Sequence, residues 1–180
     1  LSNLGNLNTS ASDVITVTVS DTGSVAAANL KTLDGKTAGV ITVSAATISG
    51  SYSDIADVYA AAQDGRISGL GNEALTVDAG MTAAQANSLA GLTSGVVTAT
   101  LASSSLADLS SLSETGNAYT ITITDTTAAA ADLNALDGKT TVDVIVTSVT
   151  TITGSYSDIN TLYTNTANFT GLGDEAFVVT

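Results

Sequence analysis

The feature that most limits what this chain can fold into is an internal repeat. The string GSYSDI occurs at residues 50–55 and again at 154–159, which is 104 positions later in a chain of 180 residues. Two more strings return at nearly the same offset: LDGKT at 33–37 and 136–140, and GLGNEA at 69–74, which becomes GLGDEA at 171–176. A fixed period changes the whole fold prediction, so the repeating unit of about 103 residues is the starting point.

A smaller period lies inside the large one. Pairs of branched apolar residues three positions apart recur at intervals of 20 to 34 residues: Leu4/Leu7, Leu30/Leu33, Ile55/Val58, Leu89/Leu92, Leu109/Leu112, Leu133/Leu136 and Ile159/Leu162. Alanines precede several of these pairs, as in SVAAANLKTL and TAAAADLNAL. A spacing of three with small neighbours predicts a short helix that has one narrow apolar stripe.

Polar residues and glycines mark the expected helix ends. Side chains that accept hydrogen bonds from first-turn amides are expected at Asp21 or Ser24, at Ser53, at Thr82, and at Asp125 or Thr127. Three helices are expected to stop at glycines with positive φ, namely Gly35, Gly91 and Gly138.

Between the helices the apolar period changes from three to two, which predicts strands. Seven segments have this pattern or are short apolar runs: 14–21, 40–44, 74–78, 95–101, 118–125, 142–146 and 176–180. The expected inward residues of the two clearest segments are Ile15, Val17 and Val19, and Tyr119, Ile121 and Ile123. The extra strings ATISG and TTITG leave open a second strand on another face.

Alternating strands and short helices predict an α/β fold, built as an elongated parallel α/β solenoid. This solenoid is β-helix-like, with one short helix per coil and about seven coils. We expect residues 1–180 to form one repeat domain with about 1.7 copies of the long unit, the first at 1–105 and a partial second at 106–180. The ends fall inside a predicted helix and a predicted strand, so the chain is expected to be a fragment of a longer array.

Composition limits the function classes. Seventeen acidic residues against four basic ones give a net charge of −13, which disfavours binding to nucleic acid and to anionic membranes. Cysteine and histidine are absent, so disulfides, thiolate ligands and imidazole chemistry are excluded. Apolar runs are too short for a membrane-spanning helix, and no signal peptide is recognised at Leu1.

The string SVAAANLKTLDGKTAGVITVSAATISGSYSDIADVY, with ISGLGNEALTV after it, resembles the Ala/Thr-rich tandem repeats of very long secreted or cell-surface proteins of marine bacteria, cyanobacteria among them. The resemblance covers essentially the whole chain. It implies an extracellular or cell-surface location, a structural or adhesive role, and export by a type I route. The calcium-binding nonapeptide GGxGxDxxx of some secreted proteins is absent, which argues against calcium-driven folding.

Two repeated motifs invite a catalytic interpretation. DGKT ends like a phosphate loop, but the first glycine of that motif is missing and the string follows a helix, so a helix end with a turn is favoured. Glu73 and Glu175, with Asp174, resemble a carboxylate pair for glycoside hydrolysis. Four coils would separate the two glutamates by about 19 Å, beyond the roughly 5 to 9.5 Å of such pairs. Solvated loop acids are therefore favoured.

Three sets of side chains are candidates for binding. Asp21, Asp78 and Asp125 end strands and are expected to cap helices, with a Ca²⁺-binding column as the alternative. Outward threonines form rows suited to exposed strands, or to ice or polysaccharide: Thr16/Thr18, Thr98/Thr100 and Thr120/Thr122/Thr124. Tyrosines recur at Tyr52, Tyr59, Tyr156 and Tyr163; the second and fourth are expected to pack with the hydroxyl at the surface.

We therefore predict a structural extracellular repeat domain, such as a spacer, an adhesin stalk, or a surface-layer or fibre component. No catalytic, cofactor or metal site is assigned and no enzymatic activity is expected, although Ca²⁺ stays open. The expected partners are neighbouring repeats of the same protein, with self-assembly into a fibre or lattice as an extension. The alternative function is a binding module that uses the threonine face or the aspartate column for polysaccharide, ice or surface adhesion.

Overall fold

The structure, a computed structural model, describes residues 1, 6–102 and 104–180 of the chain. It contains two compact units. Unit 1 comprises residues 1–79 and 89–97, and unit 2 comprises residues 80–88 and 98–180. Helix α3 (Ala83–Ala90) and strand β7 (Val97–Thr100) each contribute residues to both units.

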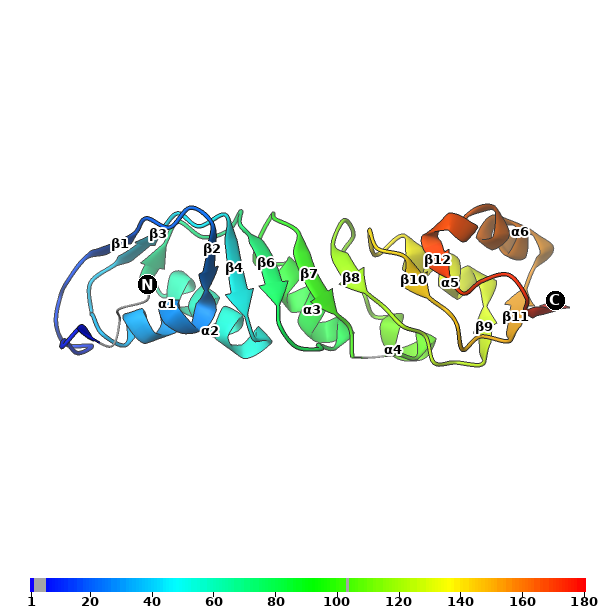
Figure 1. Ribbon diagram of the computed structural model, residues 1–180, viewed down its shortest axis with the longest axis horizontal. Helices are drawn as coiled ribbons and strands as arrows, with labels where there is room; N and C mark the ends of the chain where they lie inside the picture. Colours follow the sequence, from blue (N-terminus) through cyan, green and yellow to red (C-terminus); the bar gives the residue numbers. More distant parts are fainter. Residues whose placement is uncertain (2–5, 103) are drawn as a thin grey trace. The chain divides into compact units, whose positions relative to one another are not determined.

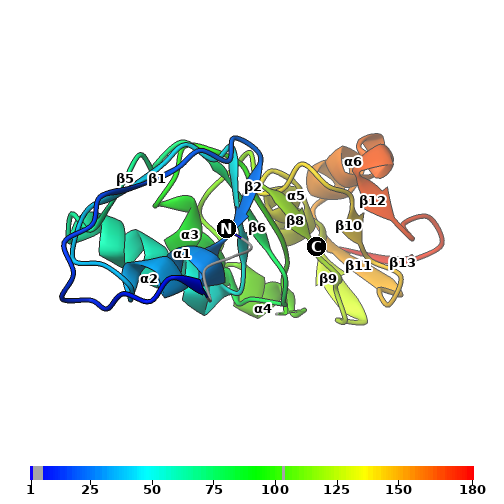
Figure 2. The same ribbon diagram turned by 60° about the vertical axis from the view of Figure 1, so that its left-hand side comes forward.

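Unit 1 consists of short strands and two helices. Its elements are β1 (Val17–Val19), β2 (Ser24–Ala26), α1 (Ala27–Asp34), β3 (Ile41–Val43), β4 (Thr47–Gly50), α2 (Tyr52–Gln63), β5 (Ile67–Ser68) and β6 (Ala74–Val77). Strands β1, β3 and β5 pair in parallel, and so do β2, β4 and β6. Figure 2 shows α1 and α2 side by side, with β1 and β5 along another side of the unit.

Unit 2 repeats this order after a short helix and strand. Its elements are α4 (Leu106–Leu109), β8 (Ala118–Thr120), β9 (Thr127–Ala129), α5 (Ala130–Asp137), β10 (Val144–Ile145), β11 (Thr151–Gly154), α6 (Tyr156–Thr164), the 3-10 helix η2 (Thr166–Asn168), β12 (Phe169–Thr170) and β13 (Ala176–Val179). Parallel pairing joins β7 to β8, β10 to β12, and β9 to β11 to β13. Figure 1 labels most of these elements.

Residues 24–77, called segment A, and residues 127–179, called segment B, have the same internal structure. In segment A, Val25 pairs with Ile48, which pairs with Leu75. In segment B, the equivalent residues Ala128, Ile152 and Phe177 pair in the same register. The helix pairs α1/α2 and α5/α6 also correspond. The two segments therefore share the register of their strand pairing as well as their sequence.

Each unit buries its apolar side chains between its strands and its helices. In segment A the inward residues of the two sheets, such as Ile41 and Ile48, are fully buried, as are Leu30 and Ile55 on the helices. Burying a side chain of this size contributes about 1.5 to 3 kcal/mol. The predicted apolar pairs supply this core, since both members are buried in Leu30/Leu33, Ile55/Val58, Leu109/Leu112, Leu133/Leu136 and Ile159/Leu162. Leu4 of the first pair lies outside the described residues.

The fold is mixed α/β with parallel sheets and six α-helices in the described residues, and none of these sheets closes on itself. All seven predicted strand segments contain a strand, and the prediction of parallel pairing is confirmed. The strings ATISG and TTITG contain β4 and β11, which belong to different sheets from β3 and β10. The second strand that the sequence left open is therefore present.

Two predicted helices begin later than expected. Ser24–Ala26 and Thr127–Ala129 form strands β2 and β9, because pairing with β4 and β11 outweighs the helical preference of alanine. The caps expected at Asp21 or Ser24 and at Asp125 or Thr127 are consequently wrong. The helices start after Ala26 and Ala129, whose side chains make no capping bond.

The remaining helix-end predictions have mixed outcomes. Thr82 caps α3 as predicted, because Gln85 N–H donates to its hydroxyl at 3.2 Å. Helix α2 is capped by Ser51 and not by Ser53; the Ser51 hydroxyl accepts from Asp54 N–H at 3.1 Å. Gly35 and Gly138 do end α1 and α5, but their φ angles of −70° and −65° are helical, so the prediction of positive φ is wrong.

The inward assignments hold in one strand segment and fail in part of the other. Tyr119, Ile121 and Ile123 are all fully buried, as predicted. Val19 is buried, but Ile15 is 40% exposed, so its predicted inward position is wrong. The two residues differ in their place in the fold: Tyr119 lies within β8 and pairs with Ala99 of β7, whereas Ile15 precedes β1, which begins at Val17.

Candidate functional site

The polar residues that segments A and B share are the natural candidates for a functional site. The two GLGxE strings place Glu73 and Glu175 directly before β6 and β13. The two LDGKT strings place Thr37 and Thr140 directly after α1 and α5. The contacts of these four side chains show whether they form a reactive site or stabilise the backbone.

Glu73 is bound by the turn that precedes it. Its carboxylate accepts the Gly71 N–H at 2.9 and 3.1 Å and the Asn72 N–H at 3.0 Å. The turn requires glycine, because Gly69 has φ +85° and Gly71 has φ +126°. A Cβ at Gly69 would also collide with the Val43 carbonyl oxygen. The carboxylate therefore accepts hydrogen bonds from backbone amides that this tight turn, with its positive-φ glycines, would otherwise leave unpaired.

Glu175 performs the same task in segment B. Its carboxylate accepts the Gly173 N–H at 2.9 and 3.2 Å, and it also accepts a short hydrogen bond from the Tyr163 hydroxyl. Burial, followed by this hydrogen bond, raises the pKa of the Tyr163 phenol well above its ordinary value. Phe177 packs edge-on against the Tyr163 ring with centroids 5.1 Å apart.

The interpretation of Glu73 and Glu175 as solvated loop acids is wrong, because their residues are only 2% and 7% exposed. This burial could not be predicted from the sequence, since a GLGxE string in a loop is equally compatible with a free acid. Charge-assisted hydrogen bonds from backbone amides replace the lost hydration. Glu73 belongs to unit 1 and Glu175 to unit 2.

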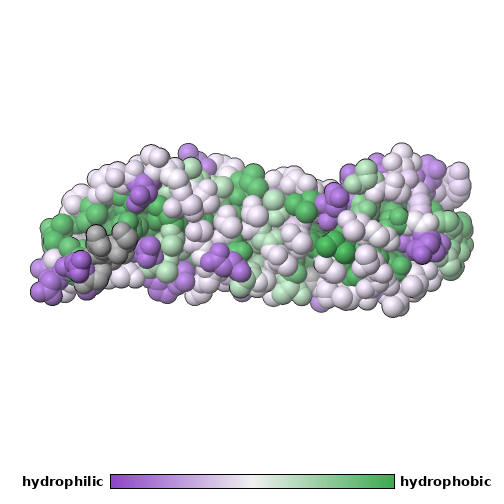
Figure 3. All heavy atoms as spheres, in the orientation of Figure 1, coloured by the Kyte–Doolittle hydropathy of each residue, from purple (hydrophilic) through white to green (hydrophobic). Residues whose placement is uncertain are grey.

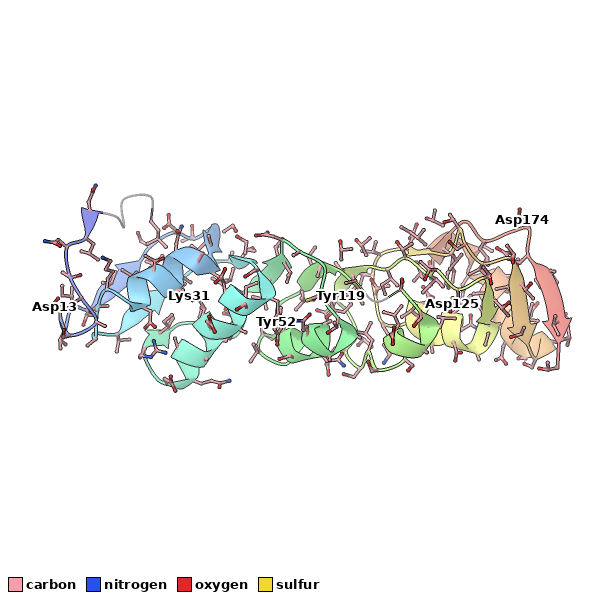
Figure 4. The ribbon with its side chains drawn as sticks, turned by 90° about the horizontal axis from the view of Figure 1, so that it is seen from below. Asp13, Lys31, Tyr52, Tyr119, Asp125 and Asp174 are labelled. Atoms are coloured by element: carbon pink, nitrogen blue, oxygen red, sulfur yellow. The ribbon has the colours of Figure 1, made fainter. Side chains whose placement is uncertain are left out.

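Tyr59 on α2 occupies the position that Tyr163 has on α6, yet its environment differs. Its hydroxyl is buried and has no hydrogen-bond partner among the described residues. Two more residues separate Tyr59 from Glu73 than separate Tyr163 from Glu175, and α2 is longer, with 12 residues against nine. The expectation of a surface hydroxyl is therefore wrong for Tyr59. Tyr156 is highly exposed, and Tyr52 is half-buried at the start of α2 (Figure 4).

Three threonines bond to backbone that lies 20 to 22 positions earlier in the chain. The Thr37 hydroxyl accepts from Ile15 N–H and Gly39 N–H, each at 2.9 Å, and lies 2.7 Å from the Ile15 carbonyl. The Thr140 hydroxyl accepts from Tyr119 N–H at 3.0 Å and donates to the Tyr119 carbonyl at 2.8 Å. We call Thr37, Thr93 and Thr140 the bridging threonines.

Thr93 makes the third of these bridges. Its hydroxyl donates to the Glu73 carbonyl at 2.6 Å and accepts from Gly95 N–H at 3.0 Å. This role was not predicted from the sequence, although a pattern was available: KTAGV at 36–40 and LTSGV at 92–96 share threonine two residues before glycine. That glycine is required because a Cβ at Gly95 would collide with the Glu73 carbonyl oxygen.

The DGKT strings form helix ends and turns, as predicted. Gly35 N–H donates to the Lys31 carbonyl at 3.2 Å, and Lys36 N–H donates to the Leu33 carbonyl at 2.9 Å. In segment B, Lys139 N–H donates to the Leu136 carbonyl at 2.9 Å. The backbone amides that a phosphate loop would direct at a ligand are used inside the helix end.

Asp78 and Asp125, two of the three aspartates expected to form a column, make separate contacts. Asp125 accepts the Leu106 N–H at 2.8 Å and so binds the start of α4, not the start of α5. Asp78 N–H donates to the Gly50 carbonyl at 3.0 Å. No group of three or more acidic side chains suited to a metal ion occurs in the described part of the chain. Within unit 2, Asp125 and Asp174 lie apart in Figure 4.

The predicted threonine rows do face outward. Thr16, Thr18, Thr98, Thr100, Thr122 and Thr124 are exposed and Thr120 is half-buried. In unit 1, Thr18 pairs with Thr42, which pairs with Ser68, so three hydroxyl-bearing residues lie in one line across β1, β3 and β5. The Ser68 hydroxyl donates to Thr42 Oγ1 at 3.2 Å.

A groove of about 230 Å³ lies between α4 and α5 in unit 2. Its lining is mainly leucine, and Asp132 and Lys139 are the charged residues among those that line it. A single acid and a single base on an apolar lining do not supply the nucleophile, base and oxyanion donors that hydrolytic chemistry requires.

Comparison with known proteins gives no relative on which an assignment can be based. No protein-family model matches the chain, and neither the curated proteins nor the solved structures give a significant match. No helix in residues 1, 6–102 and 104–180 has the length and apolar character needed to cross a bilayer.

Proposed function

We propose that this chain is a structural repeat segment, built as an elongated parallel α/β solenoid of about seven rungs. A rung is one turn of chain that contains a strand, a short helix and the return to the next strand. We propose that it serves an extracellular or cell-surface protein as a spacer, stalk, surface-layer or fibre component and has no catalytic role.

One observation carries this proposal: the polar residues that the two segments share bond to backbone. Glu73 and Glu175 bind turn amides, Thr37 and Thr140 bridge to the preceding strand, and Ser51 and Ser155 cap helices. A catalytic or ligand-binding repeat would instead direct shared polar groups into a cavity.

The proposed mechanism is cumulative burial. Each rung covers the apolar face of its neighbour, as Val25, Ile48 and Leu75 do in aligned register across β2, β4 and β6. A bridging threonine then fixes the backbone of one rung to the one before it. Length and stiffness increase with the number of rungs, and each added rung needs contacts only with its neighbours.

Deletion and duplication of one long unit test the proposal. Removing residues 24–126 joins Gly23 to Thr127, which replaces Ser24 in the same register. Inserting a second copy of 24–126 is the reciprocal variant. We expect both proteins to fold, and their maximum dimensions in X-ray scattering to change by equal and opposite amounts of about 19 Å, the height of four rungs.

A deletion out of phase is the matched control. Removing residues 24–113 joins a loop to a segment of different register and should abolish cooperative unfolding. If the in-phase deletion also fails to fold, or if the duplication leaves the maximum dimension unchanged, the repeat proposal is wrong. Immunogold electron microscopy of the native cells tests the location: labelling confined to the cell interior would contradict the surface role.

A binding role for the outward hydroxyls is the second candidate. The aligned line Thr18, Thr42 and Ser68 favours it, since residues on neighbouring parallel strands are about 4.8 Å apart and can match a regular surface. Replacing Thr18 and Thr42 by lysine should abolish ice recrystallisation inhibition or polysaccharide pull-down if this line binds. The matched control is Ser24→Lys, on a different sheet. Absence of both activities in the parent chain would exclude this candidate.

A further inference from the structure

Strands β6 and β13 are equivalent, but among the described residues β6 has a paired strand on each side, whereas β13 has one on a single side. In segment A, Leu75 is 0% exposed and Val77 is 7% exposed. At the equivalent positions of segment B, Phe177 is 52% exposed and Val179 is 62% exposed. Figure 3 shows apolar surface where β11 and β13 lie in Figure 1.

The backbone of β13 is also open on one side. Ala176 N–H and Thr180 N–H donate to β11 and its flank, at Thr150 and Gly154, just as Ala74 and Asp78 donate to Ala46 and Gly50. Alternate amides of a parallel strand face opposite neighbours. In segment A the next amide, Leu75 N–H, donates to the Val96 carbonyl at 3.0 Å. The Phe177 N–H therefore faces the side of β13 on which the described part of the chain has no paired strand.

We infer that the β13 edge is a docking surface for one more rung with the sequence pattern of residues 79–105, here called the connecting rung. This inference rests on the proposed stacking function. In unit 1 the connecting rung supplies what β13 lacks: Val97 is fully buried, Val96 accepts the Leu75 amide, and Thr93 bridges to the Glu73 carbonyl. The backbone carbonyl of Glu175 is the equivalent acceptor in segment B for a threonine of an added rung.

The residues just before β1 give a second indication of the same partner. Ile15 is 40% exposed, whereas its equivalent in unit 2, Tyr119, is fully buried. Tyr119 is covered because β8 pairs with β7, where Ala99 is its partner. At Leu75 and at Tyr119 the covering neighbour comes from residues 79–105, and no such neighbour is described at Phe177 or Ile15.

Charge favours this occupant over a second copy of the whole chain. Residues 79–105 contain no Asp, Glu, Lys or Arg, so the connecting rung can be covered on both faces without desolvating a charge. Two whole chains carry −13 each and repel at low salt.

The test is an extended chain in which residues 1–180 are followed directly by a second copy of residues 79–105. Thr180 is equivalent to Asp78, so this junction keeps the register. Amide hydrogen exchange at Phe177 and Val179 should slow by ~100-fold or more, toward the rate at Leu75, because a paired amide exchanges only on local opening. The matched control carries aspartate at the appended counterparts of Val97 and Ala99, and should exchange as the parent chain does.

Other outcomes separate the inference from the function on which it rests. Unchanged exchange at Phe177 and Val179, with Leu75 still protected, would overturn the docking inference and leave the stacking proposal standing. Fast exchange at Leu75 and Ile48 in the parent chain would overturn the stacking proposal itself. Protection of Phe177 in the parent that rises with concentration, with dimers in sedimentation, would make a second copy the occupant and overturn the inference.

Discussion

Segments A and B connect equivalent elements through equivalent residues, but segment A uses ion pairs where segment B uses hydrogen bonds from side-chain amides. In segment A, Lys31 on α1 forms ion pairs with Asp54 at 3.1 Å and Asp57 at 2.7 Å on α2, and Arg66 pairs with Asp34. In segment B the equivalents of the two cations are Asn134 and Asn168. These amides donate to the Asp158 carbonyl and to Asp137 Oδ2, each at 3.0 Å.

The ion pairs of segment A and the amide hydrogen bonds of segment B occur with the same strand register. The geometry of the repeat therefore does not depend on charge. The aligned apolar residues and the backbone pairing are common to both segments, and they are buried. Exposed ion pairs contribute little because water and salt screen them. The surface links are therefore interchangeable, whereas the interior and the glycine turns are fixed.

The largest expected loss of stability comes from a substitution in β6, compared with the equivalent substitution in β13. Leu75→Ala should cost about 2 to 5 kcal/mol of unfolding free energy, because it leaves a cavity in a fully buried position. Phe177→Ala, at the equivalent half-exposed position, should cost less than half as much. Urea unfolding of the two variants measures both values. Equal losses would show that β13 is as well packed as β6.

The next largest change in stability is expected at Tyr163, compared with its equivalent Tyr59. Tyr163→Phe removes a hydrogen bond to the Glu175 carboxylate and should cost about 1.5 kcal/mol. Tyr59→Phe removes a buried hydroxyl without a described partner and should leave stability unchanged or raise it by up to about 1 kcal/mol. Denaturation at neutral pH compares them. Destabilisation by Tyr59→Phe would mean that its hydroxyl does have a partner.

Alkaline pH should weaken unit 2 through Tyr119. Burial, and then the negative charge of Glu114, raises the pKa of this phenol from 10.0 to about 12. The folded state retains the proton, so the contribution of Tyr119 is fully present below about pH 10 and is lost as pH rises through about 12. Urea midpoints across this window should fall in the parent. Tyr119→Phe should flatten the fall, whereas Tyr52→Phe should not.

The smallest expected effect comes from making segment A resemble segment B. In the parent, hydrogen bonds first from Ser51 and then from Lys31 lower the pKa of Asp54, and hydrogen bonds to Asp57 and Asp54 raise the pKa of Lys31. The Asp54 contribution is present above the ordinary aspartate pKa of 3.8 and is lost as pH falls below it. The Lys31 contribution is present below pH 10.5 and is lost above it.

Lys31→Asn should therefore reduce the dependence of the melting temperature on NaCl and on acid pH, with little change at neutral pH and physiological salt. Asn134→Ala is the matched control, because it removes a neutral link and should leave salt dependence as it was. A parent melting temperature that does not respond to salt would remove the contrast between the two segments.

Local pattern was enough to predict several parts of the fold. The alternation in AYTITITD placed Tyr119, Ile121 and Ile123 inside, and the spacing of Leu30 and Leu33 placed a buried helix stripe. These signals work because side-chain direction follows backbone period. The same logic failed at Ser24–Ala26, where pairing with β4 overrode the local preference for helix.

The candidate site was harder to predict because its contacts are between distant residues. Thr37 meets Ile15, and Thr140 meets Tyr119, more than twenty positions away in the chain. Ser51 and Ser53 are equally good caps by residue type, and only the end of β4 decides that Ser51 caps α2. Without knowing which amides a turn leaves unpaired, an acid such as Glu73 is indistinguishable from a solvated one.

By itself, then, the sequence determined the repeat, the alternation of strand and helix, the parallel pairing and the apolar positions, since each follows from periodicity along the chain. Only the tertiary structure decided that Glu73 and Glu175 are buried. It also decided that, among the described residues, Tyr163 has a partner while Tyr59 has none, and β6 has two paired neighbours while β13 has one. The physical reason is that burial and hydrogen bonding depend on which segments become neighbours in space, and identical letters acquire different neighbours in segments A and B.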